Sequence, residues 1–141
     1  MKPIQGKKMI VLVRATVLTV GLNGKNEILE ELPIRVVTKQ SGFEAARSLK
    51  NEKVDGVISR WNLIDMADGW FLKRLRVAKP DIALIAFVQA GNERQEIAAR
   101  GLGVCAVLTD DDNDDFFRET VANVLGIGQA VAAKTASRMK R

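Results

Sequence analysis

An apolar run near the middle of the chain ends in side chains that could bind a ligand. The stretch "GVISRWNLIDMADGW", residues 56–70, passes from apolar residues to Ser59, Arg60 and Trp61. A guanidinium holds its N–H donors in one plane and can bind a phosphate or a carboxylate through two parallel hydrogen bonds. Tryptophan is enriched among the residues that dominate protein interfaces. The sequence therefore directs attention to the point where this run ends.

The chain lacks the residues that several other kinds of catalytic or binding site require. The chain has no histidine, which excludes histidine-based triads and histidine-ligated metal sites. "GLNGKNE", residues 21–27, has a Gly-Lys pair without the spacing or the hydroxyl of a P-loop. "DDDNDD", residues 110–115, lacks the alternating ligands, the glycine and the final glutamate of a calcium loop, which favours a helix-capping acidic loop. We predict that the protein binds no metal ion or cofactor.

Length and composition indicate a single globular domain. The 141 residues are 47% hydrophobic, enough for an ordered core. The single cysteine, Cys105, allows no intrachain disulfide and favours a reducing, cytoplasmic location, where it would be an inert core residue. No apolar run approaches the roughly 20 residues of a membrane span. The basic start of the chain meets Arg14 too early for a signal peptide, so we expect no membrane contact.

The positive charge is concentrated at the two ends. The net charge is +5, yet residues 1–8 hold three lysines and residues 129–141 hold four bases, with no acid in either segment. The body between them is mildly acidic. Basic ends can bind nucleic acid, and they can equally be solvated termini. We predict a domain over residues 1–128 and a basic tail or linker start over 129–141.

Short apolar runs alternate with segments of helical spacing. Their richness in valine and isoleucine predicts strands buried on both faces of a parallel sheet. This alternation predicts a doubly wound α/β domain. A short helix is expected over 24–32, after an irregular stretch that extends to about Asn23. The predicted strands are "MIVLV" 9–13, "IRVV" 34–37, "VDGVIS" 54–59, "IALIAF" 82–87 and "VCAVL" 104–108.

The helical segments carry recognisable ends. Ser41 with Glu44, and Asn92 with Gln95, have the spacing of capping boxes, and Gly101 suits a helix C-terminus. The acids of 110–115 suit the first turn of a last helix, where the helix dipole favours negative charge. The expected buried faces are Phe43, Ala46 and Leu49 in the first of these helices, Trp70, Leu72, Leu75 and Val77 in the next, and Phe117, Val121 and Val124 or Leu125 in the last.

Two stretches resemble a response-regulator receiver domain. "VDGVISRWNLIDMADGWFLKRLR" is similar to its third strand, active loop and third helix, with one extra loop residue. "PDIALIAF" and "AARGLGVCAVLTDDDNDDFFRETVANVLG" are similar to its fourth strand through its fifth helix. The resemblance implies a flavodoxin-like receiver topology, five parallel strands in the order 2-1-3-4-5. It also implies a phosphorylation site where strands 1 and 3 end.

The chain departs from the family at the phosphorylation site. Receivers need two acids after strand 1 for Mg²⁺, an acceptor aspartate ending strand 3, a hydroxyl ending strand 4 and a lysine ending strand 5. Mg²⁺ requires oxygen ligands, which arginines do not supply. We therefore expect a non-enzymatic pseudo-receiver that is not phosphorylated by the family's mechanism. The aligned residues here are Arg14 and Ala15, then Arg60 (or Ser59), then Phe87 or Val88, and finally Asp110.

The altered pocket admits more than one arrangement. Asp110 could bridge Arg14 and Arg60 and hold the loops in one state, or the two arginines could bind an anion such as a nucleotide phosphate. Each arginine could instead pair with a local acid, and Ser59 is a weaker candidate as a phosphate acceptor. The local acids considered are Asp110, Asp111, Asp65 and Asp68.

The resemblance implies signalling through protein contacts. The usual output and dimer surface of receivers maps to 92–100, 104–108 and 113–126, so we expect a protein partner or a homodimer there. Trp61 is a candidate partner contact, whereas Trp70 is expected to cover the sheet edge. The alternatives are nucleic-acid binding through the basic ends and a small-anion sensor at Arg14 and Arg60.

Overall fold

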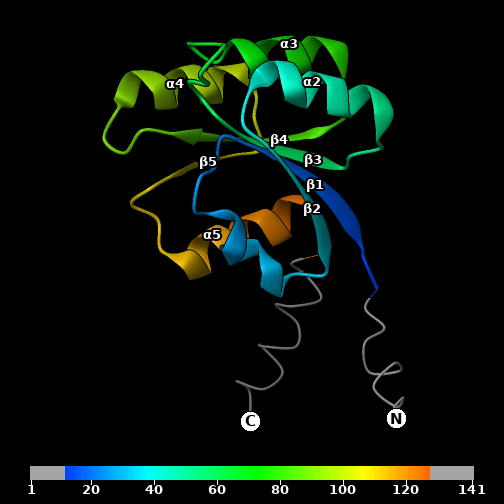
Figure 1. Ribbon diagram of the computed structural model, residues 1–141. Coiled ribbons are helices and arrows are strands. Elements are labelled where there is room, and N and C mark those ends of the chain that lie inside the picture. The colour runs from blue at the N-terminus through cyan, green and yellow to red at the C-terminus, as the bar shows by residue number, and fades with distance from the viewer. Residues whose placement is uncertain (1–11, 128–141) are drawn as a thin grey trace, which may run out of the picture.

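The computed structural model describes residues 12–127, which form one parallel sheet covered by helices on both faces (Figure 1). The strand order is β2-β1-β3-β4-β5, which confirms the predicted doubly wound α/β class. The predicted basic ends, 1–8 and 129–141, lie outside the described residues. The strands are β1 (Ala15–Val20), β2 (Ile34–Lys39), β3 (Gly56–Arg60), β4 (Ala83–Val88) and β5 (Ala106–Thr109).

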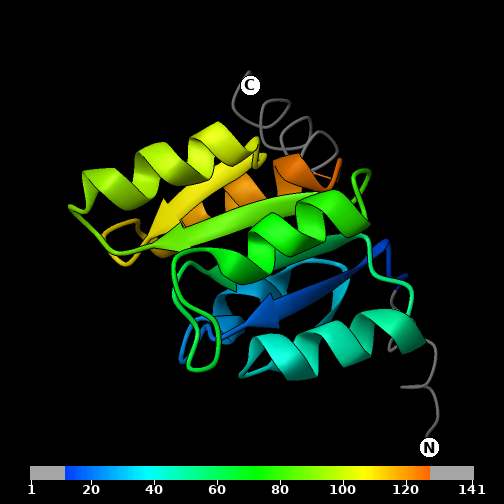
Figure 2. The ribbon, with the colours of Figure 1, turned by 90° about the horizontal axis from the view of Figure 1, so that it is seen from above.

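Two layers of helices enclose the sheet. Figures 1 and 2 show α2 (Gly42–Asn51), α3 (Trp70–Ala78) and α4 (Glu93–Leu102) together on one face. The 3₁₀ helix η1 (Asn26–Glu31) and α5 (Asp114–Val124) cover the other face. The short helix predicted over 24–32 is thus present, as a single 3₁₀ segment. Among residues 12–127 no helix is both long and apolar enough to cross a membrane.

Each face of the sheet has its own hydrophobic core. Successive strand residues point to opposite faces: in β1, Val17 belongs to the core under η1 and α5, and Leu18 to the core under the other three helices. In β3, Ile58 and Val57 divide in the same way. Strands buried on both sides explain why the apolar runs of the sequence show no alternation.

The first strand lies six residues later than predicted. Residues 12 and 13 form no strand, and β1 begins at Ala15. The threonines of "ATVLTV" make the segment look less apolar than "MIVLV", although threonine is β-branched and favours strands. Thr19 is fully buried because its hydroxyl donates a 2.7 Å hydrogen bond to Oδ1 of Asn26. A partner from η1 thus satisfies a polar side chain inside the core.

The predicted helix starts are confirmed, and one predicted helix end is wrong. The Ser41 hydroxyl accepts the Glu44 N–H (3.1 Å), and Asn92 Oδ1 accepts the Gln95 N–H (3.0 Å). Gly101 lies inside α4, which continues to Leu102. Gly103 ends the helix instead, with φ of +85°, a conformation that glycine adopts without a steric penalty.

The buried faces of two helices differ from the predicted ones. In α2 the sheet is covered by Ala45 and Leu49, while Phe43 is 63% exposed and Ala46 is also exposed. In α3 the helix starts directly after Gly69, so that Phe71, Leu72 and Leu75 face the sheet. Trp70 and Val77 remain 50% and 82% exposed, contrary to the predicted face. The stripe of α5 is confirmed for Phe117 and Val121, both fully buried.

The prediction that Cys105 is an inert core residue is wrong. The side chain is exposed, because Cys105 precedes β5, which begins at Ala106. β5 is an edge strand of the sheet.

Candidate functional site

Four strand ends meet at the carboxyl edge of the sheet. The register pairs Val20 of β1 with Ser59 of β3, and Arg60 with Phe87 of β4. Val88 pairs in turn with Thr109 of β5. Because these pairs lie level with one another, the side chains and loops that follow them share one edge, where sheets of this topology bind ligands.

Arg60 spans two strand ends at this edge. Its Nε donates a 2.8 Å hydrogen bond to the carbonyl oxygen of Gly21, directly after β1. Its Cζ lies 4.8 Å from the ring centroid of Phe87, over the face of the aromatic ring. Arg60 and Phe87 are register partners and so point to the same side of the sheet. The guanidinium is thus held by a backbone carbonyl and by cation–π attraction.

The positions after β1 are filled by a glycine and a leucine. Gly21 has φ of +72°, and a Cβ atom placed on it would lie 3.0 Å from Cδ2 of Leu63 and 3.6 Å from Cβ of Arg60. Leu22 is fully buried. The space beside the end of β1 is therefore occupied by side chains that supply no oxygen ligand.

Arg14 and Ala15 do not belong to this edge, which corrects the predicted pocket. Ala15 is the first residue of β1, and the Arg14 N–H donates to the carbonyl of Pro33 at the amino edge of the sheet. A six-residue strand separates them from Gly21, a distance of roughly 20 Å. Arg14 and Arg60 therefore form no joint anion site, and Asp110 bridges neither of them.

Asp110 faces Lys25 instead. The Lys25 Nζ lies 4.0 Å from an oxygen of Asp110, whose side chain is half-exposed. An exposed ion pair at this distance contributes little to stability. The expected pairing of Arg60 with a local acid is also not found among the described residues. Its bonded partner is the Gly21 carbonyl.

The remaining pocket residues are closed to solvent. Ser59 has no exposed surface, and its hydroxyl donates a 3.0 Å hydrogen bond to the carbonyl of Arg60. Phe87 is fully buried and Val88 nearly so, at the end of β4 where receivers place a hydroxyl. A buried hydroxyl that is already hydrogen-bonded is poorly placed to attack a phosphate donor.

Trp61 anchors the loop after β3 from inside. It is 4% exposed, its N–H donates to the Phe87 carbonyl (2.9 Å), and its carbonyl accepts the Gly69 N–H (2.8 Å). The indole lies so close to Gly69 that a Cβ atom there would overlap it. Trp61 is therefore not an exposed partner contact. From the sequence we expect Trp61 to be the candidate contact and Trp70 to be the covering residue. The structure shows the reverse, because Trp61 is buried and Trp70 is exposed.

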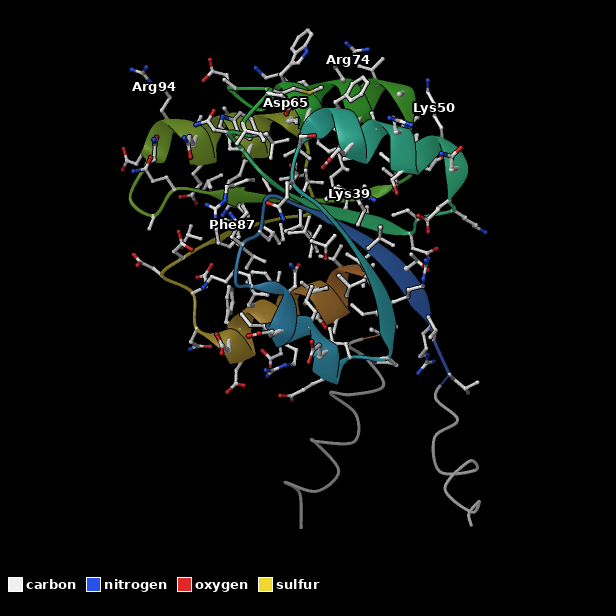
Figure 3. The ribbon with its side chains drawn as sticks, viewed as in Figure 1. Lys39, Lys50, Asp65, Arg74, Phe87 and Arg94 are labelled. Carbon is white, nitrogen blue, oxygen red and sulfur yellow. The ribbon has the colours of Figure 1, made fainter. Side chains whose placement is uncertain are left out.

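Asp65 ties the same loop to the start of α2. Its two carboxylate oxygens accept the N–H groups of Gly42 (2.8 Å) and Phe43 (2.9 Å). Burial raises the pKa of Asp65, but the two backbone N–H groups outweigh that effect and hold the pKa below its usual value. The free N–H groups of a helix start favour a negative charge in this way. Figure 3 shows Asp65 beside α2, on the layer away from Phe87.

The geometry of the edge can be compared with known proteins. No family model matches the sequence, and none of the curated proteins is similar to it. Solved structures do match. A signal receiver domain of an HD domain-containing protein from Pseudomonas fluorescens Pf-5 aligns with a TM-score of 0.72 at 19% identity, over 89% of this chain and 97% of that one. The chain has the receiver fold.

Two further receivers show the same relationship. The chemotaxis response regulator CheY4 of Vibrio cholerae has a TM-score of 0.68 at 20% identity, over 78% of this chain and 98% of that one. A receiver domain protein from Methanospirillum hungatei JF-1 has a TM-score of 0.70 at 17% identity, over 82% and 97% of the two chains. At these identities the likeness shows the receiver fold alone.

Among residues 12–127 no group of three or more acids and cysteines could hold a metal ion.

The sequence missed several residues of this edge. Gly21, Leu22 and Lys25 occupy it in place of Arg14 and Ala15. A signal was present, since "TVLTV" followed by "GLNG" is a strand followed by a turn. The longer apolar run of residues 9–13 concealed it.

Proposed function

We propose that this chain is a receiver-like signalling or regulatory module that acts by contact with other proteins, without catalysis and without phosphorylation by the aspartyl mechanism. One observation carries the proposal. Arg60 ends β3, where receivers hold their acceptor aspartate, and its guanidinium is held between the Gly21 carbonyl and Phe87. A guanidinium cannot accept a phosphoryl group, and its charge would repel Mg²⁺.

The surroundings of Arg60 support the same proposal. Gly21 and Leu22 stand where the acids for Mg²⁺ would be required, and a larger residue at Gly21 would press on Leu63. The loop is held by Trp61 on Gly69 and by Asp65 on α2. These contacts favour one arrangement of the edge without a phosphate. The module would then signal by whether it is present and bound to its partner, and not by a change of shape on phosphorylation.

Treatment with beryllofluoride and Mg²⁺ tests this proposal. The amide NMR spectrum should remain unchanged by beryllofluoride with Mg²⁺, and acetyl phosphate should add no phosphate mass to the chain. A receiver that retains the acceptor aspartate serves as the positive control. Large shifts at residues 59–61, or a stable phosphorylated species, would overturn the proposal.

For the contact surface we propose the edge formed by α4, β5 and α5. Three exposed side chains with apolar character lie on or directly before these elements: Ile97, which is 70% exposed, Cys105, and the half-exposed Phe116. Exposed apolar side chains of this kind can mark interaction sites. The partner would be another protein or a second copy of the chain.

Paired surface variants test the contact surface. Ile97→Asp on α4 should weaken binding of a co-purified partner, or of a second copy, by at least tenfold. Leu12→Asp, before β1, is the matched control, because Leu12 is 78% exposed and belongs to none of these three elements. Equal effects of the two variants would count against this surface. The nucleic-acid alternative depends on the basic ends, outside residues 12–127, and remains a prediction from the sequence.

A further inference from the structure

The sheet separates two layers of opposite charge. On one face, residues 42–53 and 70–79, here called the basic layer, hold seven bases and two acids. On the other face, residues 26–31 and 110–119, here called the acidic layer, hold nine acids and one arginine. Figure 1 shows α2 and α3 above the sheet, with α5 below it. The basic layer and the acidic layer therefore carry opposite net charge, while α4, on the same face as the basic layer, holds two acids and two bases.

The basic layer also exposes aromatic side chains. The Arg47 Cζ lies 6.0 Å from the ring centroid of the exposed Phe43, and the Arg74 Cζ lies 5.8 Å from that of Trp70. Ile64, in the loop between β3 and α3, is also exposed. Tryptophan and arginine are the residues most enriched at the energetic centres of interfaces.

The cations of the basic layer are available to a binding partner. Arg47, Lys50 and Arg74 are exposed, and none forms an ion pair with an acid in the part of the chain that the structure describes. In Figure 3 the labelled Lys50 and Arg74 lie on the upper layer and point away from the sheet. Their charge suits an acidic surface that also offers an apolar side chain.

The acidic layer of a second copy has this chemistry. Asp111, Asp114 and Glu119 are exposed, and within the described residues none pairs with a base. Phe116, three residues before Glu119 in α5, is half-exposed beside them. Side chains three residues apart on a helix are neighbours. An aromatic side chain surrounded by acids thus complements aromatic side chains surrounded by bases.

We propose that the protein associates with itself head to tail, the basic layer of one copy binding the acidic layer of the next. The two layers lie on opposite faces of the sheet, so each contact leaves one basic and one acidic layer free. Such a heterologous contact extends into an open row of copies and does not close as a twofold dimer. The acidic layer shares α5 and Phe116 with the α4–β5–α5 contact proposed above, so one copy cannot use the same α5 in both contacts at once. The head-to-tail contact differs in that it also requires the basic layer.

Two charge-reversed variants test the proposal with the full chain. Arg47→Glu with Arg74→Glu reverses part of the basic layer, and Asp111→Lys with Glu119→Lys reverses part of the acidic layer. Far-ultraviolet circular dichroism and thermal melts establish that both variants fold. Sedimentation and light scattering then give the mass of the wild type, of each variant and of their equal mixture, in about 20 mM and about 500 mM NaCl, which screen charges differently.

The proposal predicts a specific set of masses. The wild type should exceed twice the monomer mass at low salt and return to the monomer at high salt, while each variant alone stays monomeric. The mixture should associate again to at least a 1:1 dimer, because the intact acidic layer of one variant can bind the intact basic layer of the other. A monomeric wild type at low salt would overturn the proposal. So would association of the basic-layer variant alone, which would show that the acidic layer binds another basic segment.

Discussion

The Nε of Arg60 donates its hydrogen bond to the Gly21 carbonyl across the ends of β3 and β1, 39 residues apart in sequence. The bond joins the ends of the two strands, β1 and β3, whose carboxyl ends lie at the edge where sheets of this topology bind ligands. A fixed cation thus occupies the edge, and it leaves the Gly21 carbonyl satisfied without solvent.

Removal of this donor should destabilise the domain. Arg60→Met keeps an unbranched apolar side chain over Phe87 and loses both the hydrogen bond to Gly21 and the cation–π contact. We expect a loss of about 1–2 kcal/mol in the free energy of unfolding, measured by urea denaturation. Arg94→Met is the control, because Arg94 is exposed on α4 (Figure 3) and should change stability by less than about 0.5 kcal/mol. Equal effects of the two variants would contradict the role given to Arg60.

The contact between Gly69 and Trp61 should make Gly69 hard to replace. Gly69→Ala forces a Cβ into the indole and places alanine at φ of +71°. The two penalties together predict a loss of about 2–4 kcal/mol. Gly91→Ala separates the backbone penalty from the steric overlap, because Gly91 has φ of +79° but no atom lies near a new Cβ. This variant should cost only about 1 kcal/mol. Thermal or urea melts of both variants measure the two losses in stability. If the Gly91 variant is as unstable as the Gly69 variant, the contact with the indole contributes nothing to the cost of Gly69→Ala.

The link from Asp65 to α2 should depend on pH. Asp65→Asn removes one of two acceptors for the Gly42 and Phe43 N–H groups and should cost about 1 kcal/mol at pH 7. The pKa of Asp65 is lowered in the folded protein. Its contribution is therefore complete above the unfolded-state pKa of about 3.9 and is lost as the pH falls through the lower folded-state value.

Urea midpoints measured between pH 7 and pH 2 follow this change. The difference between the wild type and Asp65→Asn should be constant from pH 7 to about pH 5 and should shrink below about pH 4. Asp81→Asn is a suitable control, because Asp81 is exposed and accepts no side-chain hydrogen bond among the described residues. A difference that grows as the pH falls would show the opposite sign of linkage.

The two tryptophans should be distinguishable by fluorescence. Trp61 is buried and Trp70 is half-exposed. Trp70→Phe should leave emission at shorter wavelength with weak acrylamide quenching, and Trp61→Phe should leave the solvent-exposed, readily quenched component. Circular dichroism confirms that both variants fold. The reverse assignment of quenching would mean that Trp61 is the accessible side chain after all.

The sequence predicted the fold better than it predicted the site. Four of the five strands were placed within about two residues, because buried parallel strands are continuous apolar runs bounded by turns. The caps at Ser41 and Asn92 were also predictable, since they depend on neighbours three residues away. These features are local, and local patterns in a sequence are sufficient to locate them.

The site depended on features that are not local. A misplaced first strand moved the whole edge and put Arg14 beside Arg60, although a strand length separates them. The burial of Trp61 depends on Gly69, eight residues later, where a glycine opens the space for the indole. The predicted third strand ended at Ser59, and Arg60 was aligned with the acceptor position, with Ser59 as the alternative; β3 ends at Arg60. Its bond to Gly21 could be seen only once β1 was in register with β3.

The small size of η1 has a consequence for how the protein is made. The core beneath the sheet is closed by one 3₁₀ segment and by α5, which Arg118 joins through its hydrogen bond to the Ile28 carbonyl. α5 is translated after all five strands. While residues 114–124 are still inside the ribosome, only η1 can cover this face, and Phe87 lacks the ring of Phe117 against which it packs. Completion of the fold is therefore expected after α5 leaves the exit tunnel, and a nascent chain that stalls before that point would present a partly covered apolar face to chaperones.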